Sequence, residues 1–159
     1  MDPVCHTLMG GALAQAGLKR RTTLATATLL IGANLPDIDV LAYAWGPLAA
    51  LDFRRGWTHG ILALILLPLA LTGGILLWDR WRSSRQTGRT AAVPRQILLL
   101  AFIAILTHPI LDSLNTYGVR WLVPFSEQWF YGDTLFIVDP WAWLFLGAGI
   151  WLGIRRERQ

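Results

Sequence analysis

The hydrophobic and polar positions of the chain divide it into apolar runs separated by short polar connections. Three runs, at residues 60–78, 96–114 and 135–154, each have about the 20 residues that a helix needs to cross a ~30 Å hydrocarbon core. Two earlier runs, at residues 4–18 and 22–35, reach only a little over ~20 Å as helices. The pattern predicts an all-α, polytopic membrane bundle with three full transmembrane helices and two shorter N-terminal membrane or interfacial helices.

Basic side chains mark one side of this predicted bundle. They gather between the two short segments, in the loop at 79–95, and in the tail at 155–159. Threading the segments alternately brings all three groups to one side, which the positive-inside rule assigns to the cytoplasm. The groups are Lys19, Arg20 and Arg21; Arg80, Arg82, Arg85, Arg89 and Arg95; and Arg155, Arg156 and Arg158. We therefore expect a multi-pass protein of the bacterial inner membrane whose loop and tail are cytoplasmic.

Composition limits the classes of partner. The net charge of +4 does not indicate a nucleic-acid partner, because the basic residues flank apolar runs. Hydrophobic residues make up 54% of the 159 positions, so we expect one membrane-embedded domain over residues 1–159, with lipid as its environment. The first residues lack the features of a secretory signal, and the single cysteine excludes an internal disulfide. The oligomeric state is not defined by the sequence.

The apolar, aromatic connection at residues 43–57 predicts a short interfacial helix.

Six polar side chains are predicted near the opposite, non-cytoplasmic face. They are His6, Asp37, Asp39, His59, His108 and Asp112. His108 and Asp112 are four residues apart, so they share one face of a helix, and each is costly in lipid unless it is paired or metal-bound. Nitrogen and oxygen ligands without a thiolate suit zinc, manganese or iron. The sequence therefore predicts a divalent-metal site, zinc foremost, holding one or two ions.

Structural roles are an alternative for these residues. A histidine in a membrane protein is often hydrogen-bonded to a neighbouring helix, and Asp37 or Asp39 can cap a helix. Asp139 before Pro140 is better explained as a helix N-cap with proline at the first helical position. The joint placement of three histidines and an aspartate pair at one face favours the metal site.

Four motifs in order resemble a known family. "HTLMG", "LPDID", "RRGWTHG" and "HPILDSLNTYGVRWLVPF" look like the membrane-bound metal-dependent hydrolases of the YdjM-like group, from about His6 to Pro140. The resemblance implies hydrolase activity and the ligands His6, Asp37, Asp39, His59, His108 and Asp112. The order of His, Asp, His and HxxxD is also faintly similar to the all-helical zinc-dependent phospholipase C group.

The chain departs from the family pattern at three positions. Arg54 and Gly60 stand where the family often has the first histidine and the serine of HRGxTHS, and Val40 stands where some members have a histidine. The departures remove two nitrogen ligands and so weaken the expectation of two bound metals and of activity.

A metal ion at the non-cytoplasmic membrane face would activate a water, so the predicted site indicates a hydrolase. Phosphate esters fit best as its substrates. Arg54 and Arg55 precede His59 and offer paired donors to phosphate oxygens; Arg120 is a further candidate of the same kind. Arg54 and Arg55 can equally pair with lipid headgroups or a nearby acid. Asp39 or Asp112 can serve as general base. The predicted substrate is a phospholipid or lipid-linked phosphate.

Two rival functions belong to other classes. Intramembrane His and Asp also build ion and proton pathways in transporters, and a metal-binding membrane protein needs no hydrolysis. A pathway requires polar residues at several depths, whereas "LLPLALTGGILLW" contains almost none. A structural protein that binds a partner through its aromatic face would not need a metal.

Overall fold

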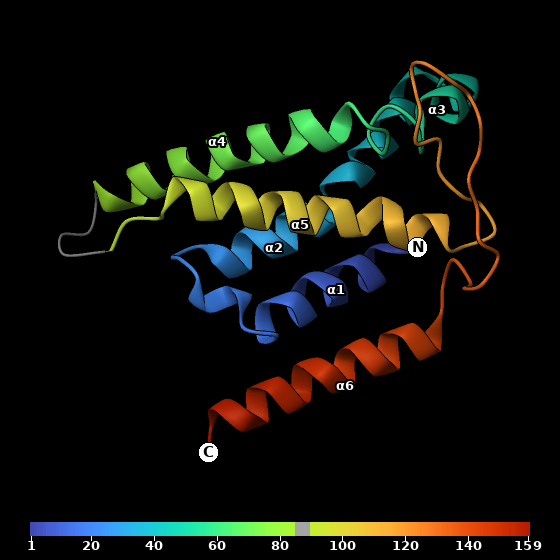
Figure 1. The fold of residues 1–159 in the computed structure, drawn as a ribbon. Helices are drawn as coiled ribbons and strands as arrows, with labels where there is room; N and C mark the ends of the chain where they lie inside the picture. The colour runs from blue at the N-terminus through green and yellow to red at the C-terminus, as the bar shows by residue number, and fades with distance from the viewer. Residues whose placement is uncertain (85–89) are drawn as a thin grey trace.

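The computed structural model describes residues 1–84 and 90–159, which form an all-α bundle (Figure 1). Arg85 and Arg89 of the predicted basic loop lie outside the described residues. The helices are α1 (Pro3–Gln15), α2 (Ala25–Asn34), α3 (Pro47–Phe53), α4 (Ala63–Ser83), α5 (Pro94–Ser113) and α6 (Pro140–Glu157). Two 3-10 segments, Leu18–Arg20 and Leu35–Trp45, join the early helices. The predicted all-helical membrane fold is confirmed.

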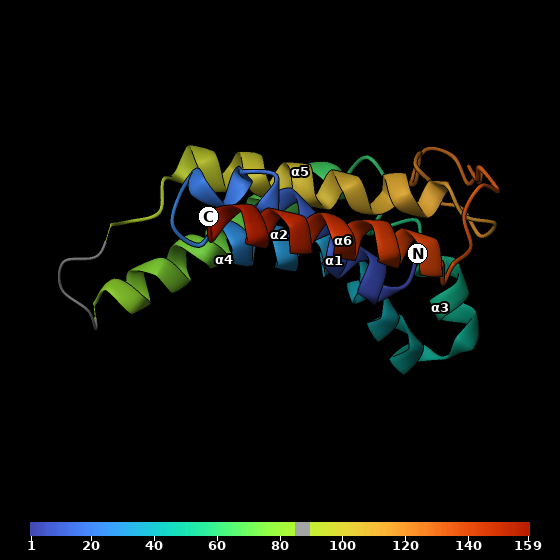
Figure 2. The same cartoon turned by 90° about the horizontal axis from the view of Figure 1, so that it is seen from below.

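Five helices lie roughly side by side along the bundle, in the order α4, α5, α2, α1 and α6 (Figures 1 and 2). Helix α2 packs between α1 and α5, while α6 contacts the rest of the bundle mainly through α1. The short helix α3 and the 3-10 segment before it project from one end. This arrangement makes α2 the middle helix of the five and places α5 between α4 and α2.

Small residues let α2 approach its neighbours closely. A Cβ atom at Gly10 in α1 would lie 2.8 Å from the carbonyl oxygen of Leu29, and one at Gly32 in α2 would lie 2.8 Å from the Cβ of Ala104. Close backbone approach through glycine and alanine is the usual way in which helices associate in lipid. The contacts fix α2 against α5, and the residues that follow α2 carry Asp37.

Two buried apolar clusters hold the bundle together. One joins α4 to α5 through Leu71, Ile75, Ile97, Ala101 and Ile105. The other joins α1 and α2 to α5 through Ala14, Ala25, Leu29, Leu100 and Ala104. Both clusters lie between the two ends of the bundle, so they support the polar groups at the ends without containing them.

The set of membrane-length segments differs from the predicted set at one place. Among the described residues, Ala25–Trp45, Ala63–Ser83 and Pro94–Ser113 are long and apolar enough to cross a membrane. The last two are predicted spans. The first, Ala25–Trp45, was not predicted as a span; it is long enough because the 3-10 segment extends α2 without a break. The predicted span at 135–154 is not in this set, because α6 begins only at Pro140 and its final turn is charged.

The helix starts follow capping rules. Asp2 accepts hydrogen bonds from the backbone N–H groups of Val4 and Cys5 at 2.9 and 3.2 Å, before α1. Asp139 accepts from Trp141 and Ala142 at 3.0 Å each, with proline at the first position of α6. The N-cap predicted for Asp139 is therefore confirmed.

The two ends of the bundle have different chemistry. What we call the basic end carries the turn after α1, the end of α4, the start of α5 and the C-terminus, and it gathers the three predicted groups of Lys and Arg among the described residues. What we call the site end carries the N-terminus, α3 and the loop at 114–139. The predicted segregation of basic groups from the His and Asp residues is thus present in the fold. The compartment that each end faces stays a prediction.

Candidate metal centre

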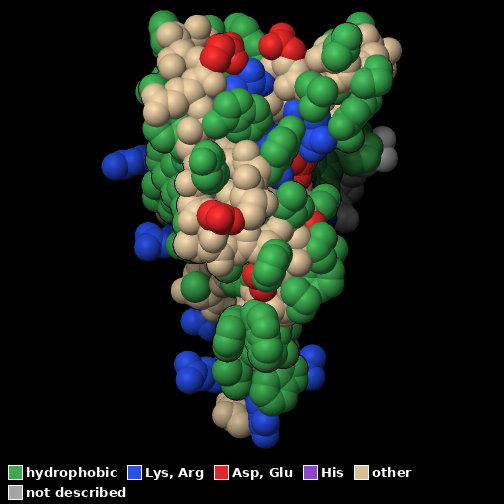
Figure 3. Space-filling model, turned by 90° about the vertical axis from the view of Figure 1, so that its right-hand side faces the viewer, with side chains coloured by type: hydrophobic (Ala, Val, Ile, Leu, Met, Phe, Trp, Pro, Cys, Tyr) green, Lys and Arg blue, Asp and Glu red, His purple; other side chains and the backbone are tan. Residues whose placement is uncertain are grey.

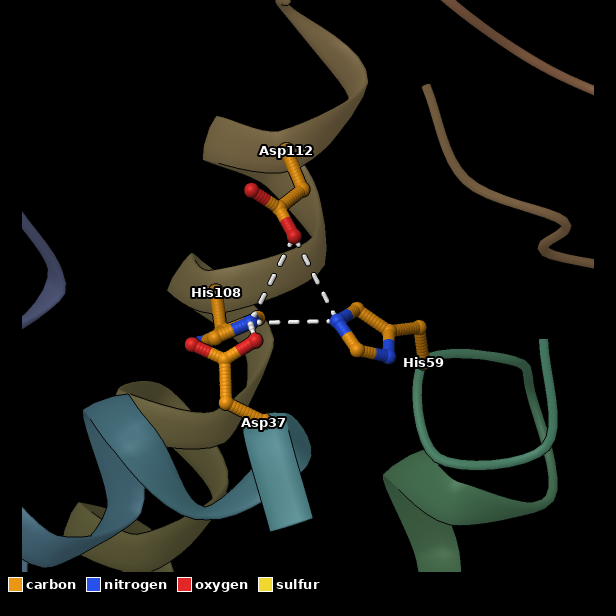
Figure 4. Close-up of side chains that lie close together, drawn as sticks. All are labelled: Asp37, His59, His108 and Asp112. Carbon is orange, nitrogen blue, oxygen red and sulfur yellow. Dashed lines mark hydrogen bonds and ion pairs between the residues drawn. The ribbon is translucent and has the colours of Figure 1, made fainter. Parts of the chain in front are cut away.

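Four ionisable side chains from three separate segments converge at the site end (Figure 4). Asp37 comes from the 3-10 segment after α2, His59 from the loop before α4, and His108 and Asp112 from α5. One ligand atom from each lies within 4.8 Å of those of the other three. We call these four residues the metal group. All are fully buried except Asp37, whose side chain is 23% exposed.

Four distances between ligand atoms of the metal group are close to those around one small divalent ion, and all of these atoms lie within 4.8 Å of one another. His59 Nε2 and His108 Nε2 are 3.1 Å apart, and Asp112 Oδ2 lies 3.3 Å from the first and 3.5 Å from the second. Asp37 Oδ1 is 3.5 Å from His108 Nε2. Ligands at about 2.0–2.1 Å from a tetrahedral ion are about 3.3–3.4 Å from one another, so the donor set suits zinc or a similar ion.

Helix α5 sets the position of two members of the metal group. His108 and Asp112 are one turn apart on the same face, as the sequence predicts. His108 Nδ1 lies 2.6 Å from the carbonyl oxygen of Ala33 at the end of α2, where it donates its proton. In the neutral ring this contact places the proton on Nδ1, while Nε2 is directed at the metal group, the arrangement typical of metal-binding histidines.

A second orienting contact holds His59. Its Nδ1 is 2.9 Å from Thr58 Oγ1, and Thr58 Oγ1 donates in turn to Asp39 Oδ2 at 3.4 Å. Burial, followed by the nearby His108 and Arg55, lowers the pKa of His59 well below its usual value. A neutral imidazole with its Nε2 free is the form that binds a metal.

Gly60, next to His59, lies in close contact with the backbone of other residues. A Cβ atom at Gly60 would lie 3.0 Å from the carbonyl oxygen of Gly56 and 3.1 Å from that of Val123. The family's serine at this position would therefore crowd two backbone carbonyls here. The departure from HRGxTHS is matched to the local packing of this chain.

Asp39 lies behind His59 and outside the metal group. Its Oδ2 is 3.6 Å from His59 Nδ1, on the side of the ring away from Nε2, and accepts the backbone N–H of Arg55 at 3.0 Å. Its Oδ1 accepts from Arg54 Nε at 3.4 Å. Both oxygens of this buried carboxylate are thus occupied by protein donors. The predictions of Asp39 as a ligand and as a base remain without support from these contacts.

His6 adjoins the metal group from α1. Its ring stacks on that of His108 with centroids 3.6 Å apart, and its Nε2 is 3.4 Å from Asp112 Oδ1. The amino group of Met1 also pairs with Asp112 Oδ1. Neither ring nitrogen of His6 makes a hydrogen bond to the described residues, although the ring is fully buried. His6 therefore adjoins the metal group without belonging to it.

Arg55 is the arginine at the metal group. It is 4% exposed, and its Nη1 lies 3.1 Å from Asp112 Oδ2 and 3.3 Å from the carbonyl oxygen of Gly118. The guanidinium also lies over the ring of Tyr117, 4.7 Å from the centroid. Arg55 has a φ of +54°, a left-handed conformation that is uncommon outside glycine and recurs at functional sites.

The other two predicted phosphate-binding arginines are engaged elsewhere. Arg54 is bound to Asp39 and, at 3.2 Å, to Tyr43 Oη. Arg120 pairs with Glu127 and donates to the carbonyl oxygen of Arg54 at 3.0 Å. Arg120 thereby ties the loop after α5 to the loop that carries His59. Its contacts are those of a buried structural residue.

Several residues of the site went unnoticed in the sequence. Thr58 and the carbonyl oxygen of Ala33 orient the two histidines. Asn115, just after α5, accepts from the backbone N–H groups of Tyr117 and Gly118 at 2.8 and 3.1 Å, and its Nδ2 is 3.5 Å from Asp112 Oδ1. The signal in the sequence was an Asn three residues after the Asp and three before a glycine, which is typical of a side-chain-stabilised turn.

The surface at the site end is mixed in character. Figure 3 looks at this end and shows Arg side chains and acidic side chains between apolar ones, with no histidine in view. The burial of all three histidines agrees with that view. The metal group is thus covered by the loops, with Asp37 as its exposed member.

Comparisons with known proteins agree with the motifs. The chain is 23% identical over 155 residues to a protein of Bacillus subtilis (strain 168) named "Uncharacterized protein YfhP"; the match covers 91% of this chain and 43% of that protein. The chain therefore spans less than half the length of this relative. No solved structure matches the chain. The model of the YdjM inner membrane protein family matches residues 1–159, and the chain belongs to that family.

Proposed function

We propose that the protein is a metal-dependent hydrolase of the inner membrane that cleaves a phosphoester bond in a phospholipid or lipid-linked phosphate. The observation that carries the proposal is the metal group: two imidazole nitrogens and two carboxylate oxygens that all lie within 4.8 Å of one another, with a buried guanidinium beside them. A divalent ion bound there supplies a water of lowered pKa and polarises a phosphoryl oxygen. The predicted zinc fits these donors best.

The residues of the chain have separate tasks in this proposal. His59, His108, Asp37 and Asp112 hold the ion. Asp39, acting through Thr58, is a positioning residue that keeps the His59 ring in place. Asp112 was also predicted as a base, but here it acts as a ligand of the ion, and its other oxygen faces the Met1 amino group and His6.

Arg55 binds the phosphate in this proposal. Its Nη1 reaches the Asp112 carboxylate, and its buried Nε makes no hydrogen bond within the described residues, which leaves that donor for a ligand. A guanidinium holds two phosphate oxygens in one plane and opposes the charge that develops on them during cleavage. Arg54 and Arg120 hold the surrounding loops, which differs from the predicted substrate contacts.

The position of the metal group favours a lipid substrate and disfavours transport. The middle of α4 and α5, residues 63–78 and 96–107, contains no ionisable side chain, so no chain of titratable groups continues from the site through the bundle. Exposed Ile38, Leu41 and Trp45 follow Asp37 on the same segment and suit contact with hydrocarbon. A lipid phosphate reaches such a site while its chains stay in the bilayer.

Activity measurements test the proposal. Purified protein in detergent or nanodiscs is offered a panel of phospholipids and lipid-linked phosphates, and phosphate or headgroup release is measured with and without a chelator. We expect release that the chelator abolishes and added zinc or manganese restores, and no release by Asp112→Asn. Release that persists with the chelator would contradict the metal mechanism, and a metal-loaded protein inactive on the whole panel would favour a non-catalytic metal-binding role.

A further inference from the structure

A groove lies on the bundle away from the metal group. It is a groove of about 740 Å³ between α4 and α5 that ends at the turn before α2. Its walls are apolar, and its residues include Leu64, Ile65, Pro68, Leu69, Leu98 and Phe102. At the basic end it is lined by Arg21, Arg95 and Gln96.

We propose that this groove binds one anionic phospholipid with a hydroxylated headgroup, such as phosphatidylglycerol. Its phosphate lies between Arg21 and Arg95, and one acyl chain lies along the apolar walls. The proposal does not depend on hydrolase activity, because the groove shares no residue with the metal group.

Charge supports the position of the phosphate. Arg21 follows the 3-10 segment after α1 and Arg95 lies in the first turn of α5, yet both line the same end of the groove, and both are exposed. Neither side chain makes an ion pair or hydrogen bond with the described residues. Basic pockets between membrane helices bind anionic headgroups, and each basic residue contributes about 1 kcal/mol to such contacts.

The amide of Gln96 supports a headgroup that can donate. Its Oε1 is buried and has no hydrogen-bond partner within the described residues. An unpaired buried acceptor costs free energy, and a donor in the bound ligand relieves that cost. A hydroxyl on the headgroup meets this need beside the two guanidinium groups.

The length of the groove supports an acyl chain. Arg95 and Phe102 are seven residues apart on α5, which is about 10 Å along the axis, and Leu64 on α4 extends the wall further. One leaflet contributes about 15 Å of hydrocarbon, half of the ~30 Å core. The walls are exposed to lipid, with Ile65 at 57% and Leu69 at 55%.

Binding of defined lipids to the delipidated full chain tests the proposal. Native mass spectrometry or a titration in detergent compares phosphatidylglycerol with phosphatidylcholine of the same chains. We expect the wild type to prefer phosphatidylglycerol by roughly 10- to 30-fold, the factor expected of two arginines. The double variant Arg21→Gln, Arg95→Gln should lose that preference.

A matched control separates the groove from general charge. Arg80→Gln with Arg158→Gln removes the same charge from the basic end at exposed positions outside the groove. This control should keep the preference; equal loss in both double variants, or no loss in either, would overturn the proposal. A circular-dichroism spectrum and melting curve of each variant establish that it is folded.

Two single variants test the headgroup and the chain. Gln96→Leu should lower affinity for phosphatidylglycerol to that for phosphatidic acid, which lacks the headgroup hydroxyls, and leave phosphatidic acid binding unchanged. Leu98→Trp places a larger side chain in the apolar part of the groove and should weaken binding of both phosphatidylglycerol and phosphatidic acid. An unchanged affinity in Leu98→Trp would show that the chain lies elsewhere and would contradict the proposal.

Discussion

Asp112 and Asp79 are two buried carboxylates in long helices at opposite ends of the bundle, and their surroundings differ. Asp79 is 5% exposed, and its Oδ2 accepts the backbone N–H of Ala92 at 2.8 Å, which ties the end of α4 to the connection before α5. Asp112 is 0% exposed and faces His59, His108 and Arg55 within 3.5 Å. Burial alone therefore does not identify a functional acid; the neighbours of each carboxylate distinguish a structural contact from a metal ligand.

The pair Asp112→Asn and Asp79→Asn gives the largest contrast. Asparagine at 112 removes a charged oxygen from the centre of the metal group, so we expect metal affinity to fall by at least ~100-fold, beyond the usual 10–100-fold effect of supporting residues. Asparagine at 79 retains an acceptor for Ala92 and should leave metal content unchanged. Elemental analysis of both purified proteins measures this. Equal metal content in the two variants would remove Asp112 from the ligand set.

The two histidines should differ from His6 in the same assay. His59→Gln and His108→Gln each remove a nitrogen of the metal group, so metal affinity should fall by at least ~100-fold, whereas His6→Gln should keep one bound ion. Isothermal titration with zinc provides the affinities. A loss in His6→Gln as large as in His59→Gln would place His6 among the ligands of the first ion.

Substitution of Arg55 should distinguish binding of the metal ion from binding and cleavage of the phosphoester. Arg55→Gln removes the guanidinium beside Asp112 while leaving all four ligands, so metal content should stay near that of wild type. Phosphoester turnover should fall by roughly 100-fold or more, the scale of losing one transition-state donor. Arg80→Gln, at the basic end, is the charge-matched control. Loss of the metal in Arg55→Gln would instead assign the arginine a structural role.

Asp39 should show a smaller effect that appears in metal affinity. Asp39→Asn weakens the contact that orients His59 through Thr58, so zinc affinity should fall by about 10–100-fold with one ion still bound at saturation. Asp133→Asn, on the exposed loop of the site end, is the control and should have no effect. Full loss of stoichiometry in Asp39→Asn would restore Asp39 to the ligands.

The smallest effect concerns stability at Asp79. Asp79→Ala leaves the N–H of Ala92 without its partner, which costs about 1–3 kcal/mol when the group stays buried. The melting temperature in detergent should fall while metal affinity is retained. If Asp79→Ala lost the metal and kept its melting temperature, Asp79 would be a metal-binding acid like Asp112, contrary to the structural role given to it here.

The sequence predicted the bundle and the convergence of the site, and physical reasons explain what it missed. Apolar run length located α4 and α5, and the one-turn spacing of His108 and Asp112 placed both on one face. It did not reveal that a 3-10 segment prolongs α2, because a change of helix type leaves no hydropathy signal. The roles of Asp39 and Arg120 depend on contacts between distant loops, which local spacing does not encode.

X-ray absorption spectroscopy at the zinc edge of the purified, zinc-loaded protein tests the central claim most directly. The account predicts one tightly bound ion with imidazole nitrogen and carboxylate oxygen neighbours at about 2.0–2.2 Å and no sulfur neighbour, and a spectrum that changes in His108→Gln but not in Asp79→Asn. A sulfur neighbour from Cys5, or a spectrum with water ligands alone, would contradict it.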